Sequence, residues 1–198
     1  NGGTYYVNVA RRDQVETVRI DRVELFNPTH PDDTAALTAL LAHATEITTC
    51  LPSVRFYDSD QADHSVAALI AEGLRRRQAE ATIVYAAENH NHAAEILEQA
   101  VTQRLAGALP SRVQFLNTVI GKMSQVVTDP REMAERKLAP IAPGLDRAFL
   151  VEEFNRILVT KTTIPGFTPG IPVFIEKDDL LPFEEAKLYG HNAIHALL

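Results

Sequence analysis

The sequence has a single cysteine, no long apolar run and no excess of basic residues. One cysteine, Cys50, cannot form an internal disulfide bond, which indicates a reducing compartment such as the cytoplasm. No run approaches the roughly 20 apolar residues that a membrane helix needs, and the first residues lack the order of a signal peptide. The net charge of −7 argues against a nucleic-acid-binding surface. We therefore expect a cytoplasmic protein whose partners are neither membranes nor nucleic acids.

The sequence also has no G-x-G-x-x-G loop, the motif whose backbone binds dinucleotide phosphates. It opens inside a strand-like run and stops within a helical pattern that has no end signal. These two features lead us to expect the middle part of a longer protein.

Strand and helix patterns alternate along the chain. Apolar residues that recur every second position, or in short compact runs, predict strands, and an apolar stripe at helical spacing predicts helices. The predicted strands are 4–12, 16–27, a strand in 46–53 that runs into a loop at Pro52, and 81–89. The predicted helices are 31–44, 64–78 and 92–105. Residues 112–127 are predicted to be rich in strand, and residues 151–160 to be a strand or a short helix. This rhythm predicts an α/β fold with a parallel sheet and helices on both faces.

Ligands of such sheets bind beyond the carboxyl ends of the strands. Two loops are therefore of interest, the one that follows Thr49 and the one that follows Ala86. Asn89 lies in the second loop, where its amide could face a ligand or could cap the helix that follows. Sequence alone leaves both roles open.

The last sixteen residues, FEEAKLYGHNAIHALL, have a helical pattern with unusual polar residues. On an α-helix at about 100° per residue, His191 falls about 40°, His195 about 80° and Asn192 about 140° from Lys187. All four fit one side of the helix. An interior glycine, Gly190, costs about 1 kcal/mol relative to alanine, which suggests a close approach of backbone or ligand there.

Two kinds of chemistry fit this side of the helix. A lysine whose pKa is lowered by burial is a general base, and an amide beside it stabilises a substrate oxygen that gains charge. Two histidines four residues apart, His191 and His195, could instead bind a metal with a carboxylate such as Glu184. A third interpretation is structural, with half-buried histidines and a lysine whose amine reaches solvent.

Lys187, Asn192 and His195 form the pattern K-x-x-x-x-N-x-x-H, which resembles the signature of the polyol-specific long-chain dehydrogenases. This family includes mannitol 2-dehydrogenase, mannitol-1-phosphate 5-dehydrogenase and the hexuronate reductases. Three further segments are similar to family segments and occur in the family's order: IVYAAENHNHAAEIL, VQFLNTVIGKM and VEEFNRILV. The resemblance extends over roughly residues 5 to 198.

The resemblance implies a metal-independent oxidoreductase that uses NAD or NADP and acts on a polyol, a polyol phosphate or a sugar acid. It implies that Lys187 is the general base, that Asn192 and Asn89 donate hydrogen bonds to the reacting oxygen, and that His195 orients the substrate. It also implies no metal ligands, with His191 as a neighbour of the site. The cofactor is expected beside Thr49, Cys50 and Glu88, and these three are the expected cofactor-binding residues.

The resemblance also implies a domain organisation. Residues 1–180 are expected to form an incomplete Rossmann-like domain that lacks its first βα unit, and residues 181–198 to begin an α-helical substrate domain. One segment departs from the family pattern, because Ile120-Gly121-Lys122 stands where the family often has V-D-R. That change removes a carboxylate that could bind substrate hydroxyls, so the substrate itself stays open. The alternatives to this oxidoreductase are a non-catalytic remnant of such an enzyme and a metal-dependent hydrolase built on His191 and His195.

Overall fold

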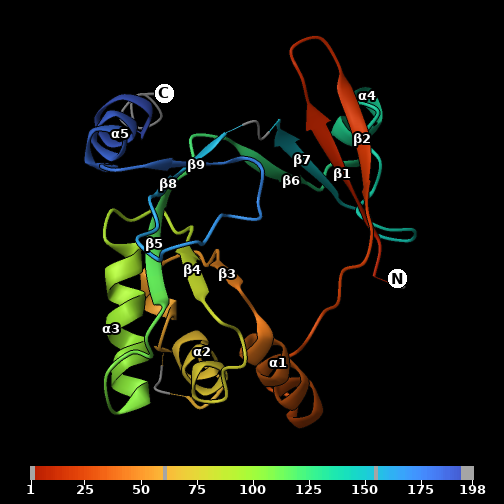
Figure 1. Cartoon of the computed structure of the whole chain (residues 1–198). Coiled ribbons are helices and arrows are strands. Elements are labelled where there is room, and N and C mark those ends of the chain that lie inside the picture. Colours follow the sequence, from red (N-terminus) through yellow and green to blue (C-terminus); the bar gives the residue numbers. More distant parts are fainter. Residues whose placement is uncertain (1–2, 60–61, 154–155, 193–198) are drawn as a thin grey trace. The chain divides into compact units, whose positions relative to one another are not determined.

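The computed structural model describes residues 3–59, 62–153 and 156–192, with the side chains in these ranges except those of Leu188, His191 and Asn192. Backbone contacts divide the chain into two compact units (Figure 1). The small unit comprises Asn1–Leu25 and Gly121–Asn155, and the large unit comprises Phe26–Ile120 and Arg156–Leu198. Residues 1–180 contribute to both units, and the incomplete Rossmann-like domain expected over these residues stays a prediction. The expected helical domain that begins at residue 181 stays a prediction.

The small unit is built on a four-stranded sheet in the order β2-β1-β7-β6. Its elements are β1 (Tyr5–Ala10), β2 (Val15–Ile20), β6 (Ser124–Val127), α4 (Pro130–Glu135) and β7 (Ala148–Glu152). β1 pairs antiparallel with β2 and parallel with β7, and β6 pairs antiparallel with β7. The two ends of the unit are therefore joined by direct strand pairing, although more than 100 residues separate them along the chain.

Asn8, a buried polar residue of β1, holds the small unit together. Its amide nitrogen donates to the carbonyl oxygens of Ala139 and Phe149, at 2.8 and 2.9 Å. Its amide oxygen accepts from the backbone N–H of Ala139 at 2.9 Å. A buried amide with all of these partners avoids the cost of an unsatisfied polar group.

Three features of this unit differ from the sequence-based prediction. The strand predicted over residues 16–27 ends at Ile20, and the first two strands belong to this separate sheet rather than to the main parallel sheet. The short helix α4 was not predicted. A strand that is hydrophobic on one side carries no signal in its sequence for which sheet it joins, since pairing partners are set by long-range contacts.

The large unit contains a five-stranded sheet in the order β3-β4-β5-β8-β9. The strands are β3 (Glu46–Thr49), β4 (Thr82–Ala86), β5 (Val113–Val119), β8 (Ile157–Thr160) and β9 (Phe174–Lys177). β3, β4 and β5 run parallel, β8 is antiparallel to β5, and β9 is parallel to β8. Residues 157–160 are thus a strand and not the alternative short helix, and β9 was not predicted.

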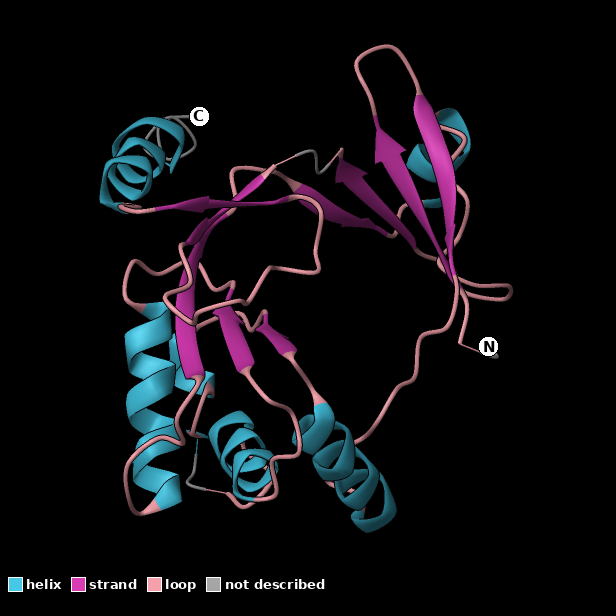
Figure 2. Cartoon of the chain, in the orientation of Figure 1, coloured by secondary structure: helices cyan, strands magenta, loops and turns pink. Residues whose placement is uncertain are grey.

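Helices cover one face of this sheet (Figure 2). They are α1 (Pro31–His43), α2 (Val66–Arg75) and α3 (Ala93–Leu105), and a 3₁₀ turn, η1 (Val54–Phe56), precedes α2. α2 and α3 bury Leu74, Leu97 and Val101 in a common core with Val84 and Phe115 of the sheet. The serine hydroxyl of Ser65 caps α2 by accepting from the N–H of Ala68 at 3.2 Å. α1 packs against α2.

The second face of the sheet packs against the segment between β8 and β9. Ile164, Phe167 and Phe174 cover Ile83, Tyr85 and Leu116 of the central strands. Glu46 ties the segment down, since its carboxylate accepts from Tyr85 Oη at 3.0 Å and from the N–H of Gly170 at 3.0 Å. The α/β, Rossmann-like fold is confirmed, with one difference in detail. In the described part of the large unit, this second face is packed by loop and strand where helix was expected.

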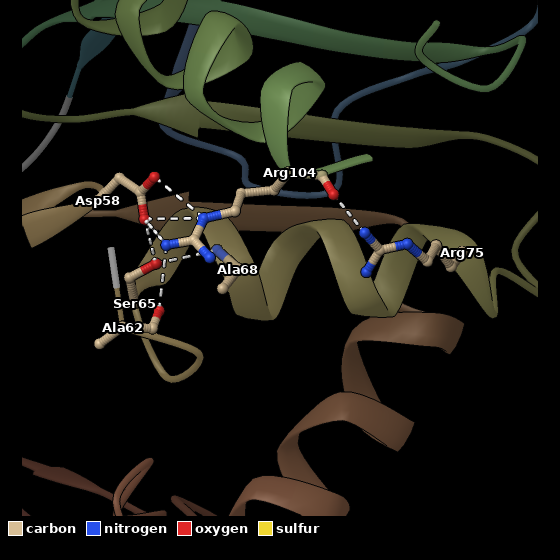
Figure 3. Close-up of polar contacts among 6 residues, drawn as sticks. All are labelled: Asp58, Ala62, Ser65, Ala68, Arg75 and Arg104. Carbon is tan, nitrogen blue, oxygen red and sulfur yellow. Dashed lines mark hydrogen bonds and ion pairs between the residues drawn. The ribbon is translucent and has the colours of Figure 1, made fainter. Parts of the chain in front are cut away.

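A hydrogen-bonded ion pair links the turn after η1 to the end of α3 (Figure 3). Asp58 accepts from Arg104 Nη2 at 2.7 Å and from Arg104 Nε at 3.0 Å, and it also accepts from Ser65 Oγ at 2.6 Å. Arg75 of α2 donates to the carbonyl oxygen of Arg104. Hydrogen bonds from Arg104 are the main cause that lowers the pKa of Asp58. The pair is mostly shielded, with side chains only 22% and 21% exposed.

The Asp58→Asn substitution is expected to lower the thermal unfolding midpoint by about 3–6 °C at pH 7, because it removes a charge-assisted pair. A carboxylate whose pKa is lowered in the folded state stabilises above its unfolded pKa, and this stabilisation is lost as the pH falls. The difference from wild type should therefore shrink below about pH 4. Asp178→Asn is the matched control, because its ion pair with Lys161 is exposed and should contribute little. Equal midpoints for the two variants at pH 7 would contradict this assignment.

Gly73 allows the close approach of α1 and α2. A Cβ atom at this position would lie 2.5 Å from the Cβ and 3.2 Å from the carbonyl carbon of Leu41. We expect Gly73→Ala to destabilise the protein by about 1–3 kcal/mol in urea-induced unfolding, because the helices must move apart. Gly107→Ala is the control, since a Cβ at Gly107 has no atom within 4 Å among the described residues. If Gly73→Ala left the free energy of unfolding unchanged, the contact between α1 and α2 would be looser than described.

Candidate active site

The carboxyl ends of β3, β4 and β5 meet at one edge of the parallel part of the sheet. Thr49 lies opposite Ala86 in the register of β3 and β4, and Ala86 lies opposite Asn117 in that of β4 and β5. Loop 87–92 leaves the sheet at this edge, after β4. Its position matches the place where parallel α/β sheets bind ligands.

Glu88, at the start of loop 87–92, is buried and points back into the fold. It is 4% exposed. Its carboxylate accepts from Thr49 Oγ1 at 3.0 Å, from the N–H of Leu51 at 2.8 Å and from the hydroxyl of Tyr57. Burial and the neighbouring Glu88 raise the pKa of Tyr57, so the phenol keeps its proton and remains a donor. Three donors from two segments thus hold this carboxylate in place.

Asn117 fixes the other end of the loop, where α3 begins. Its side-chain oxygen accepts from the N–H of Ala94 at 2.9 Å, and its side-chain nitrogen donates to Glu95 Oε2 at 2.8 Å. The first turn of a helix has free N–H groups, and Asn117 satisfies one of them from the neighbouring strand. Loop 87–92 is therefore held at both ends.

The last described element is a helix that changes its winding at the predicted base. α5 (Leu181–Ala186) is an α-helix, and Lys187–Asn192 continue it as a π-helical turn. The projection at about 100° per residue therefore fails from Lys187 onward. In a π-helix the hydrogen bonds run from i to i+5, so backbone positions 187 and 192 are one turn apart. π-Turns are rare and occur frequently at functional sites.

Lys187 of this turn contacts loop 87–92 directly. Its amine Nζ donates to the side-chain oxygen of Asn89 at 2.9 Å, across 98 positions of sequence. Burial lowers the pKa of Lys187. Lowering by burial favours the neutral amine, the form that accepts a proton, while the hydrogen bond to Asn89 favours the ammonium form. The structure therefore brings together two of the predicted catalytic residues.

A small pocket of about 60 Å³, open to solvent, surrounds this contact. Its walls come from loop 87–92, from the end of β5 and from α5. The lining residues are Glu88, Asn89, His90, Asn91, Thr118, Val119, Glu184 and Lys187. Burial raises the pKa of Glu184, with a further increase from the charge of Glu95. The pocket thus contains a half-buried amine, an amide and a carboxyl group whose pKa is raised, which suits proton transfer to and from a small polar ligand.

The predicted cofactor residues have different surroundings. Cys50 is exposed, whereas Thr49 and Glu88 are buried and hydrogen-bonded to each other. The side chain of Asn192 and the whole of His195 lie outside the described residues, as does the side chain of His191. Lys122, which stands in the segment that departs from the family pattern, belongs to the small unit and not to the unit that contains the pocket.

Three other expectations can be compared with the described residues. A Cβ atom built on Gly190 has no neighbour within 4 Å among the described residues, so the backbone approach expected there is not found. Within residues 3–59, 62–153 and 156–192, no three His, Cys, Asp or Glu side chains are close enough to hold a metal ion together. In the same ranges, no helix has the length and apolar character that crossing a membrane requires.

Sequence reasoning missed Tyr57, Asn117 and the buried state of Glu88. Tyr57 lies in a loop with no motif, and its role depends on a contact 31 positions away. Asn117 did carry a signal, because it is a polar residue near the end of a predicted buried strand, the place where ligand or loop contacts are expected.

Solved structures show what class of fold this is. The chain is similar to a D-sorbitol dehydrogenase crystallised in substrate-free form, with a TM-score of 0.69 over 93% of this chain and 44% of that one. Sequence identity is 16%, so this likeness establishes the fold alone. The fold is that of a dehydrogenase with a Rossmann-like sheet. No protein-family model matches the chain.

A curated relative gives a more particular likeness. The chain is 32% identical over 136 residues to the mannitol-1-phosphate 5-dehydrogenase of Pseudarthrobacter chlorophenolicus. The match covers 66% of this chain and 32% of the relative, so the chain spans about a third of that enzyme. The resemblance to polyol dehydrogenases that the motifs indicated is thereby confirmed.

The titration of Lys187 can be measured directly. We expect its amine to react with an acylating reagent at lower pH than that of Lys161, because burial lowers the pKa of Lys187 while Asp178 raises that of Lys161. Mass spectrometry of peptides labelled at a series of pH values gives the pH of half-maximal acylation for each lysine. These midpoints do not depend on how fast each amine reacts when it is fully deprotonated. A midpoint for Lys187 at or above that of Lys161 would show that the amine is fully solvated.

Proposed function

We propose that the complete protein is an NAD- or NADP-dependent, metal-independent oxidoreductase that interconverts a polyol, a polyol phosphate or a sugar acid with its keto form. The observation that carries the proposal is the 2.9 Å hydrogen bond between Lys187 Nζ and Asn89 Oδ1 in a pocket at the carboxyl edge of the sheet. Similarity to a mannitol-1-phosphate 5-dehydrogenase supports the substrate class.

Lys187 is the proposed general base. In the direction of alcohol oxidation, its neutral amine takes the proton of the substrate hydroxyl and becomes an ammonium group. A nicotinamide cofactor, when bound, would supply the acceptor for the hydride of the same carbon, and the C–O bond would become a carbonyl. In the reverse direction the ammonium group returns the proton. Burial supports this role because it lowers the pKa of the amine toward the working range of a base.

Asn89 has two proposed contributions. Its side-chain oxygen accepts from the protonated Lys187 and so orients the amine. Its side-chain nitrogen is the proposed donor to the substrate oxygen that gains negative charge as its proton leaves. We assign a second donor to Asn192 and the orientation of substrate to His195, on the basis of the motif K-x-x-x-x-N-x-x-H alone.

The cofactor is proposed to lie along the edge formed by the ends of β3, β4 and β5. The parallel register of these strands supports this position, since dinucleotides bind at that edge of Rossmann-like sheets. The loop with Thr49 and Cys50 follows β3 directly, and Glu88 follows β4, so these three residues border the proposed cofactor path. Cys50 is exposed and therefore accessible to a ligand.

Replacing Lys187 tests the proposal. In the complete protein, Lys187→Met is expected to lower kcat for hexitol, hexitol phosphate or hexuronate substrates by about 10²–10⁴-fold, the usual contribution of a general base. Formation of the reduced nicotinamide is followed by absorbance, with Lys161→Met as the control for loss of an exposed lysine. Alcohol oxidation by the wild type should rise with pH as Lys187 loses its proton, with a midpoint below the ordinary lysine value. A chelator should leave the activity unchanged. Full activity of Lys187→Met would refute the proposed role.

A further inference from the structure

Glu88 is the buried ionisable residue whose role the proposed reaction leaves open. Its carboxylate is directed to Thr49, Leu51 and Tyr57 and is 4% exposed. A side chain with three protein donors and so little exposed surface has few acceptor positions left for a cofactor. The contribution of Glu88 to the site therefore lies in the backbone that it holds in place.

The backbone around Glu88 forms a short turn with Asn89 at its centre. The N–H of His90 donates to the carbonyl oxygen of Glu88 at 2.8 Å, and this i to i+2 bond closes a three-residue turn. Immediately before it, the N–H of Ala87 donates to the carbonyl oxygen of Thr49 at 3.0 Å, which extends the pairing of β3 and β4 by one bond. The direction of Asn89 is thus set by a turn whose first residue is anchored through both backbone and side chain.

We propose that Glu88 is a positioning residue, whose buried carboxylate fixes the turn that presents the side-chain oxygen of Asn89 to the amine of Lys187. The inference deepens the proposed function, because it assigns the support of the candidate catalytic pair. Thr49 and Tyr57 belong to the same support. In this proposal Glu88 and Thr49 do not contact the cofactor themselves. They affect the reaction by fixing the position of Asn89.

The position of Asn89 can be followed without any catalysis, through the titration of Lys187. The hydrogen bond from the ammonium group to Asn89 favours the charged form. Asn89→Ala should therefore lower the acylation midpoint of Lys187 by about one pH unit, the equivalent of one hydrogen bond to a charged group. Among the described residues, the ionisable groups near this amine include Glu184 on α5, and Glu88 and His90 on the loop. Glu184 is in turn influenced by Glu95, His92 and Asp179. All of them remain in Asn89→Ala.

The test uses variants that weaken the hold on Glu88 and leave the Glu88 side chain itself in place. Thr49→Val and Tyr57→Phe each remove one neutral donor, since burial and Glu88 keep the phenol of Tyr57 protonated. The double variant should lower the Lys187 midpoint in the same direction as Asn89→Ala. In a background that already carries Asn89→Ala it should cause no further decrease, because the effect acts through Asn89. Asn8→Ala, which removes buried hydrogen bonds in the small unit, is the control for destabilisation elsewhere and should leave the midpoint at the wild-type value.

Activity gives a second readout. Glu88→Gln in the complete protein should lower kcat by about 10- to 100-fold, as expected for a misplaced catalytic group, with the Kd for NAD and NADP within about twofold of wild type. A wild-type Lys187 midpoint in the Thr49→Val/Tyr57→Phe variant, or an equal decrease in the Asn89→Ala background, would overturn the inference. A large rise in cofactor Kd with unchanged kcat would overturn it as well, since Glu88 would then be a cofactor contact. If the complete protein oxidises none of the substrates, the proposed function fails, while the titration still decides the role of Glu88.

Discussion

The candidate site depends on a buried carboxylate at the edge of a parallel sheet. Glu88 is removed from solvent, and such a group is tolerated inside a protein only where donors satisfy it. Its donors come from the end of β3 and from the η1 region, two segments that sequence separates by 31 to 39 positions from Glu88. The carboxylate therefore joins β3, β4 and η1 at one point, and the turn that carries Asn89 begins there.

Further contacts hold the segments around Glu88 in place. Tyr57, which donates to Glu88, is followed by Asp58, and Asp58 is held by Arg104 at the end of α3 (Figure 3). Asn117 of β5 holds the first turn of α3. Loop 87–92 is thus held by the contacts of Glu88 where it leaves β4 and by those of Asn117 where α3 begins. Both ends of its backbone are therefore fixed. Such preorganisation is what places a reacting amine and an amide at hydrogen-bond distance without loss of entropy during the reaction.

The amine itself is under two opposing influences. Burial lowers the pKa of Lys187, whereas its hydrogen bond to Asn89 stabilises the ammonium form. A general base needs a pKa that is high enough for it to take a proton from an alcohol. The pKa must also be low enough that the amine is unprotonated at the working pH. In this arrangement, any residue that moves Asn89 alters the proton affinity of Lys187, which connects the support of the turn to the chemistry of the pocket.

Local patterns in the sequence determined most of the elements and the two residues at the centre of the pocket. Periodicity is a property of neighbouring residues, so β3, β4, α2 and α3 were predictable, and the motif around Lys187 with the loop position of Asn89 indicated the site. Tertiary structure alone decided that the first two strands join β7 in a separate unit, that Glu88 is buried against Tyr57, and that the last helix changes to π winding at Lys187. The first two depend on contacts between residues that are distant in sequence. The third depends on which backbone hydrogen bonds the packing of the helix favours. The pattern of neighbouring residues contains neither kind of information.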